Sequence, residues 1–250
     1  MNEDISDFKK NISRISHSKK TKIILALDIL ESHNILERAI EIIDKVSPYI
    51  CGIKINYHLI LPLSSDNLVE LNNYIHSHNL VSIADIKLND IENTNLVALN
   101  HLFQMGFDAV IVNPFIGLAS LRRIVKHARE NKKGIISLVF VSHEGAEEGY
   151  GLQVIHKEKE TMPLFKIFLQ NSIICDVDGI VVGATKTEIF KSLYNHEHPP
   201  IYSPGIGAQG GIIDSILKRK VSFIIVGRSI LNATRIEDKL LQLSKEIDYP

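Results

Sequence analysis

The chain has 250 residues, of which 45% are hydrophobic and 23% are charged, and its formal net charge is −1 at pH 7. This composition is typical of a globular protein with a buried core, and the nearly balanced charge gives no general attraction to nucleic acid. No apolar run approaches the roughly 20 residues of a membrane-spanning helix, and the polar N-terminus does not resemble a signal peptide. We therefore expect a cytoplasmic protein that binds neither nucleic acid nor membrane.

The two cysteines, Cys51 and Cys175, are far apart in the sequence and form no C-x-x-C motif. This spacing predicts neither a disulfide framework nor a zinc site. Cys51 enters an apolar run, so we interpret it as a small buried residue and not as a reactive thiol.

Strand-like and helix-like segments alternate along the chain after a polar, mixed-charge start over residues 1–20, which we expect to form a helix or arm. Eight short runs rich in Ile and Val are typical of parallel strands buried on both faces. These runs are 22–27, 49–55, 81–86, 109–112, 134–141, 179–182, 201–203 and 223–226. Between and after them, apolar residues recur three and four apart, as in amphipathic helices. The predicted helices are 34–46, 67–78, 93–105, 118–131, 162–171, 187–194, 210–219 and 233–246.

Eight such units predict an α/β protein with a closed (β/α)8 fold, the TIM barrel, which typically has about 250 residues. An open Rossmann-type sheet is the alternative, but Leu27-Asp28 follows the first strand where that fold carries G-x-G-x-x-G. The long polar stretch 142–160 suits a loop over the active face. No linker divides the chain, so we expect one barrel domain over 22–250, preceded by an arm over 1–21.

Charged residues gather where the first three predicted strands end, and in such barrels the loops after the strands build the active site. Asp28 follows the first strand, Lys54 lies in the second, and Asp85, Lys87 and Asp90 end or follow the third. Residues two apart on a strand face the same side, and charges buried together must pair. The pattern predicts a catalytic array of alternating charge. A helix cap at Asp28, a snorkelling Lys54 and a purely structural ion network are the alternatives.

Glycine-rich segments follow the last two predicted strands. They are Ser203-Pro204-Gly205-Ile206-Gly207-Ala208-Gln209-Gly210-Gly211 and Gly227-Arg228. The loops after strands seven and eight form the phosphate site of many such barrels, glycine lets the backbone approach a phosphate, and arginine can bind it in a bidentate manner. The segments therefore predict a phosphorylated substrate, with plain turn glycines as the alternative.

Together with Asp85-x-Lys87-x-x-Asp90-Ile91-x-x-Thr94, these segments resemble the motifs of the orotidine 5′-phosphate decarboxylase family, most closely its short archaeal-type members. The resemblance extends from about residue 22 to the C-terminus. It implies decarboxylation of orotidine 5′-monophosphate to uridine 5′-monophosphate (UMP) and CO2 in pyrimidine biosynthesis, with no cofactor and no metal. It also implies a homodimer.

The resemblance assigns roles to individual positions. It implies that Lys87 protonates C6 of the pyrimidine, that Asp85 faces the departing CO2 group beside Lys54, and that Asp90 reaches across the dimer interface into the partner's site. It further implies a set of substrate-binding residues for ribose, base and phosphate: Asp28, Lys54, Ile91, Thr94, Ser142, Pro204, Gln209, Gly227 and Arg228.

Four positions depart from the family pattern, in which glycine or proline is usual: Asn56, His58, Glu92 and Glu144. We expect them to affect loop geometry, and we interpret His143 as a structural hydrogen-bonding residue. Two rival functions remain open. One is a magnesium-dependent hexulose-phosphate synthase or keto-hexulose-phosphate decarboxylase of the same superfamily, and the other is a non-catalytic barrel that binds nucleotide.

Overall fold

The computed structural model describes residues 5–30, 33–155, 161–184, 189–190, 197–205 and 221–247. The predicted helix 210–219, most of the predicted helix 187–194, and Gln209 lie outside the described residues.

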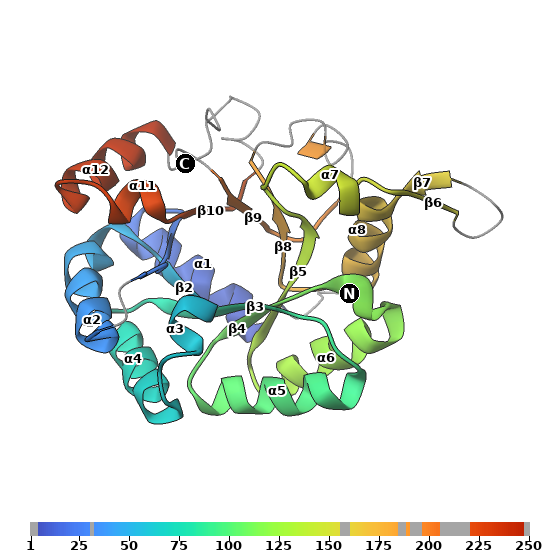
Figure 1. Ribbon diagram of the computed structural model, residues 1–250, viewed down its shortest axis with the longest axis horizontal. Coiled ribbons are helices and arrows are strands. Elements are labelled where there is room, and N and C mark those ends of the chain that lie inside the picture. The colour runs from blue at the N-terminus through green and yellow to red at the C-terminus, as the bar shows by residue number, and fades with distance from the viewer. Residues whose placement is uncertain are drawn as a thin grey trace.

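Eight parallel strands close into a barrel in the order β1-β10-β9-β8-β5-β4-β3-β2, which confirms the predicted TIM barrel (Figure 1). Each strand overlaps one of the eight Ile- and Val-rich runs. They are β1 (Ile23–Ala26), β2 (Gly52–Asn56), β3 (Val81–Leu88), β4 (Ala109–Val112), β5 (Gly134–Phe140), β8 (Gly179–Val182), β9 (Ile201–Pro204) and β10 (Phe223–Val226).

Helices surround the barrel and bury one apolar face each against it (Figure 1). The longer ones are α2 (Ile35–Val46), α4 (Ser65–Ser77), α5 (Glu92–Gln104), α6 (Leu118–Glu130), α8 (Leu164–Ile174) and α12 (Ile236–Ile247). Short helical turns follow several strands: α3 (Tyr57–Ile60), η2 (Pro114–Ile116) and α11 (Arg228–Leu231).

Two expectations about local structure were wrong in detail. The predicted second strand began at residue 49, but Ser47–Tyr49 forms a 3-10 turn with a proline in it, and the strand begins at Gly52. The stretch 142–160 was expected to be a loop, but it contains helix α7 (Ala146–Gly149) and strand β6 (Gln153–Ile155). Strand β6 pairs antiparallel with β7 (Thr161–Pro163), and this hairpin projects from the side of the barrel (Figure 1).

Helix α1 (Asp7–Lys19) is the predicted N-terminal helix, and it closes the end of the barrel at which the strands begin. Its apolar residues Phe8, Ile12 and Ile15 are buried in the same cluster as the side chains that fill the barrel interior. A Cβ atom placed on Gly134, the first residue of β5, would lie 2.4 Å from the Phe8 ring, so glycine is needed there. The closed end leaves the opposite end of the barrel for a ligand.

The predicted burial of Cys51 is confirmed, and burial raises the pKa of its thiol to about 12. Such a thiol remains protonated at neutral pH and is unreactive. Within the described residues, no helix combines the length and the apolarity that crossing a membrane requires.

Candidate active site

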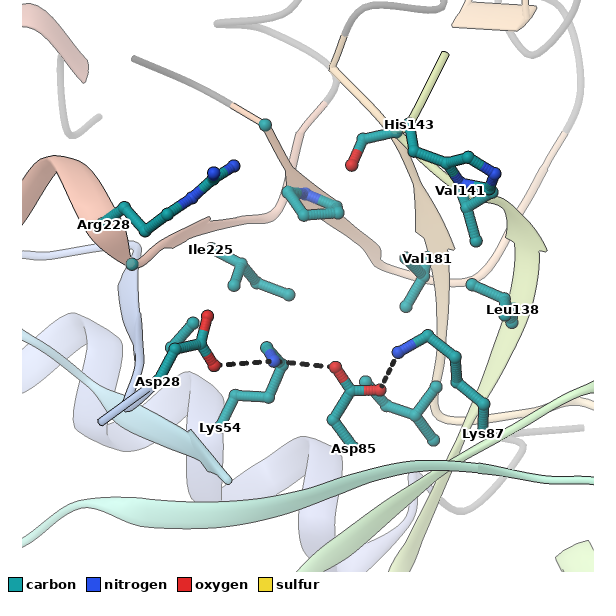
Figure 2. Close-up of a pocket in the computed structure, with 16 residues that line it drawn as sticks. Asp28, Lys54, Asp85, Lys87, Leu138, Val141, His143, Val181, Ile225 and Arg228 are labelled. Carbon is teal, nitrogen blue, oxygen red and sulfur yellow. Dashed lines mark hydrogen bonds and ion pairs between the residues drawn. The ribbon is translucent and has the colours of Figure 1, made fainter. Parts of the chain in front are cut away.

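A cavity of about 290 Å³ opens at the ends of the strands, at the end of the barrel opposite α1. Strands β1, β2, β3, β5, β9 and β10 each bring a predicted residue to its wall (Figure 2). The predicted residues in the wall are Asp28, Lys54, Asp85, Lys87, Ser142, Pro204, Gly227 and Arg228. Residues spread over most of the chain thus meet in one place, as the barrel topology predicts.

The floor of the cavity holds a row of alternating charges, Asp28–Lys54–Asp85–Lys87 (Figure 2). The two carboxylate oxygens of Asp85 accept separate hydrogen bonds, one from Lys54 Nζ and one from Lys87 Nζ, both at 2.7 Å. Lys54 Nζ is also 4.0 Å from Asp28 Oδ1. Lys54 and Asp85 are 6% and 7% exposed, whereas the Lys87 side chain is 47% exposed and faces the cavity.

Electrostatics keeps the centre of this row ionised. Burial by itself would raise the pKa of Asp85, but the ammonium groups of Lys54 and Lys87 outweigh burial and hold the pKa of the carboxyl below its usual range. Asp85 is therefore an anion at neutral pH, fixed between two cations.

Strand β3 is irregular where it carries these residues. Asp85 and Lys87 both face the cavity, as expected, although the pairing with β4 shifts register between Ala84 and Leu88. Lys87 has a φ of 47°, a left-handed conformation that is uncommon for a residue other than glycine. Such backbone conformations concentrate at functional sites. The hydroxyl of Tyr57 on α3 donates to the Ile86 carbonyl at 2.9 Å and so ties this irregular segment to the end of β2.

Glycines allow two close approaches around the cavity. A Cβ atom on Gly183, which follows β8, would lie 2.6 Å from Ser142 Cα, so any larger residue would displace Ser142 from the cavity wall. A Cβ atom on Gly227 would lie 3.2 Å from Asp28 Oδ2. The next residue, Arg228, extends its guanidinium over the cavity above Asp28 (Figure 2).

Sequence reasoning missed several residues that shape the site. His143, interpreted as a structural hydrogen-bonding residue and not as a metal ligand, lies in the cavity wall and is exposed. Asn56 donates from Nδ2 to Asp28 Oδ1 at 2.7 Å. Gly183 lies in the sequence Val-Val-Gly-Ala-Thr directly after a strand, and the small residue at a strand end was the signal that could have found it.

The predicted residues Asp90, Ile91 and Thr94 are exposed and are not among the residues that line this cavity. The turn that carries them is nevertheless well defined, because the buried side chain of Asn95 holds the Asp90 backbone on both sides. The Asp90 N–H donates to Asn95 Oδ1 at 3.1 Å, and Asn95 Nδ2 donates to the Asp90 carbonyl at 2.6 Å. The Ile91 side chain, 72% exposed, points away from the barrel core. The structure therefore does not bring these three residues to the cavity of their own barrel.

The arrangement suits an anionic ligand that needs a proton at one atom. Among the charged side chains of the described residues in the wall, Lys54, Lys87 and Arg228 outnumber the carboxylates of Asp28 and Asp85. Of the two lysines in the charged row, Lys87 has the more exposed side chain. Its ammonium group can both stabilise a developing negative charge and donate a proton.

Comparison with known proteins shows similarity over nearly the whole chain. The profile of the "Orotidine 5'-phosphate decarboxylase / HUMPS family" matches residues 21–242. A curated orotidine 5′-phosphate decarboxylase from Pyrococcus horikoshii is 35% identical over 227 residues, which cover 90% of this chain and 98% of that protein. One from Methanosarcina mazei is 31% identical over 231 residues, covering 92% and 96%. The crystal structure of the enzyme from Methanocaldococcus jannaschii, complexed with the inhibitor BMP, superposes with a TM-score of 0.77 at 26% identity and covers 91% of this chain and 99% of that one.

Proposed function

The chain belongs to the orotidine 5′-phosphate decarboxylase / HUMPS family, and we propose that it decarboxylates orotidine 5′-monophosphate to UMP and CO2 in pyrimidine biosynthesis. We further propose that it does so without a cofactor, as a homodimer in the cytoplasm. The observation that carries the proposal is the Asp85 carboxylate held between Lys54 and Lys87 on the floor of the cavity.

The charged row supplies what this reaction needs. Loss of CO2 leaves an electron pair on C6 of the pyrimidine, and this carbanion is poorly stabilised in water. In the proposed mechanism the Lys87 ammonium lies beside C6, stabilises the negative charge as it forms, and then transfers a proton to the carbon. Asp85, as a fixed anion, faces the departing carboxylate and holds Lys87 in position through the 2.7 Å hydrogen bond. Lys54 balances the charge of Asp85 from the other side.

The rest of the cavity suits the remote parts of the nucleotide. We assign the phosphate to Gly227 and Arg228, the ribose hydroxyls to Asp28 and Lys54, and the pyrimidine edge to Ser142, with Pro204 in the wall. Gln209, expected to bridge base and phosphate, lies outside the described residues. Binding energy from the phosphate can hold the reacting carbon against the charged row, although the phosphate itself takes no part in the chemistry.

A magnesium-dependent reaction of the hexulose-phosphate type is the second candidate within the family. If Asp85 were a ligand of the magnesium ion, it would be a poor one, because both of its oxygens accept hydrogen bonds from ammonium groups. A divalent cation placed there would face two positive charges at close range. The arrangement of Lys54, Asp85 and Lys87 therefore favours the metal-independent reaction.

The test is to mix purified protein with orotidine 5′-monophosphate and to follow the loss of substrate absorbance, with and without EDTA. We expect turnover to UMP at the same rate in both conditions. Turnover abolished by EDTA would indicate the magnesium-dependent reaction, and UMP binding without turnover would indicate a non-catalytic barrel.

Replacing Arg228 with alanine is expected to lower kcat/KM for orotidine 5′-monophosphate by roughly a hundredfold or more, because a charge-assisted contact to the phosphate is lost. The trace activity on orotidine, which lacks the phosphate, should change little. Steady-state kinetics on both substrates give the comparison. Equal losses on the two substrates would show that Arg228 supports the fold of the loop and does not bind phosphate.

Exposed apolar side chains support the proposed dimer. The segments that follow β2, β3 and β4 carry Tyr57, Leu61, Ile91 and Phe115, which are 50%, 75%, 72% and 66% exposed. These three strands are neighbours in the barrel, so the segments lie on one side of its mouth. A second copy seated there would cover the apolar side chains, and it would bring the partner's Asp90, Ile91 and Thr94 towards the cavity.

A further inference from the structure

Asn56 is the last residue of β2. The register between β1 and β2 places it beside Asp28, which follows β1. Ala26 of β1 is opposite Lys54 of β2, so two residues further on Asp28 comes beside Asn56. The contact is direct, because Asn56 Nδ2 donates to Asp28 Oδ1 at 2.7 Å. Asn56 is also one of the positions that depart from the glycine usual in the family.

The second contact of Asn56 fixes which way its amide points. Asn56 Oδ1 accepts the His58 backbone N–H at 2.8 Å, as the N-cap of α3. A backbone N–H can only donate, so the amide oxygen must face His58 and the amide nitrogen must face Asp28. The hydrogen bond to Asp28 thus follows from the cap, and Asn56 is held between the two groups.

This contact decides how the Asp28 carboxylate is presented to the cavity. Asp28 Oδ1 lies towards Asn56 and Lys54. Asp28 Oδ2 lies towards Gly227, on the side of the cavity where Arg228 extends (Figure 2). Lys54 by itself would orient Asp28 weakly, because its ammonium is 4.0 Å from Oδ1 but only 2.7 Å from Asp85. The terminal torsion of an aspartate has a broad energy minimum, so a carboxylate without Asn56 would rotate.

We propose that Asn56 is a positioning residue that holds Asp28 Oδ2 ready to accept a hydrogen bond from a ribose hydroxyl of the bound nucleotide. It thereby strengthens the preference of the site for nucleotides that carry ribose hydroxyls. The inference rests on the proposed function, since it takes the ligand to be a pyrimidine ribonucleotide. An acceptor that is oriented before binding loses less freedom on binding, and the hydrogen bond contributes more to affinity.

The test compares the dissociation constants of UMP and of 2′,3′-dideoxyuridine 5′-monophosphate, which lacks both hydroxyls. The wild-type protein should prefer UMP by at least roughly 10- to 100-fold, the range for one hydrogen bond to a charged group, because the missing hydroxyls remove contacts to both Asp28 and Lys54. In Asn56→Ser the serine can still cap α3 but its side chain is too short to hold Asp28. We expect the preference to fall about three- to tenfold, through weaker UMP binding, with the dideoxy nucleotide bound as in the wild type. Asn56→Asp keeps the shape and the cap but sets an anion against Asp28, and it should lower the preference at least as far.

Asn113 provides a matched control. It directly follows β4, and its Oδ1 caps the following turn by accepting the Phe115 N–H at 3.1 Å, but it does not line the cavity. Asn113→Ser should leave the preference for UMP unchanged. Equal weakening of both nucleotides by the Asn56 substitutions, or an unchanged preference, would overturn the positioning role while leaving the proposed function intact. Failure of the wild-type protein to bind UMP would overturn the proposed function, and the role of Asn56 with it.

Discussion

Replacing Lys87 with alanine is expected to lower kcat for orotidine 5′-monophosphate by roughly a thousandfold or more, because the variant loses both the proton donor and the nearest positive charge. Binding of UMP should remain measurable, since the product has already received its proton. An interaction made mainly in the transition state affects kcat far more than ligand affinity. Turnover measurements and UMP titrations on the same preparation test both statements.

The substitution is well suited to separate chemistry from folding. The Lys87 side chain is half exposed, and Asp85 retains its 2.7 Å hydrogen bond from Lys54 when Lys87 is removed. The variant should therefore fold normally. Lys87→Arg is the companion variant, because arginine keeps the positive charge but does not give up a proton at accessible pH. A Lys87→Ala protein with more than a few per cent of wild-type kcat would show that Lys87 is not the proton donor. A fully active Lys87→Arg protein would show that its charge is sufficient.

The barrel and much of its charged floor could be predicted because each rests on a local pattern. Runs of Ile and Val mark strands that are buried on both faces, and all eight were found. Charged residues at three successive strand ends had to meet, since parallel strands in a closed barrel end at the same face. The error at Tyr49 arose because apolar character by itself does not show where a turn ends and a strand begins.

Other features depend on contacts between distant segments and had no such pattern. The left-handed backbone conformation at position 87 could not be predicted, because the residue there is a lysine and not a glycine. The asparagine at 95 reads as an ordinary helix residue, although it is buried and holds the Asp90 turn. Asn56 could be predicted as a helix cap, but its hydrogen bond to Asp28 depends on the register of β1 against β2. A single sequence shows which residues could form such contacts but not which of them do.

Mixed dimers of two inactive variants are expected to regain activity if each site uses Asp90 from the partner. Lys87 lines the cavity of its own barrel, whereas Asp90 is exposed outside it on a turn fixed by Asn95. The homodimer of either variant should be nearly inactive. Lys87→Ala lacks the proton donor, and Asp90→Ala lacks a charged group that each subunit supplies to its partner's site. A mixed dimer would contain one doubly damaged site and one intact site.

Equal amounts of the two variants, refolded together, should form about half mixed dimers, so roughly a quarter of wild-type activity should return. The control is the pair Lys87→Ala with Asp85→Ala. These residues hydrogen-bond within one chain, so every site of that mixed dimer is damaged and no activity should return. Native mass spectrometry confirms that mixed dimers have formed in both experiments. Recovery with Asp90→Ala but not with Asp85→Ala requires exchange of Asp90 between subunits, because sites confined to single barrels predict no recovery in either pair. If mixed dimers of Lys87→Ala and Asp90→Ala form but are inactive, Asp90 acts in the active site of its own barrel.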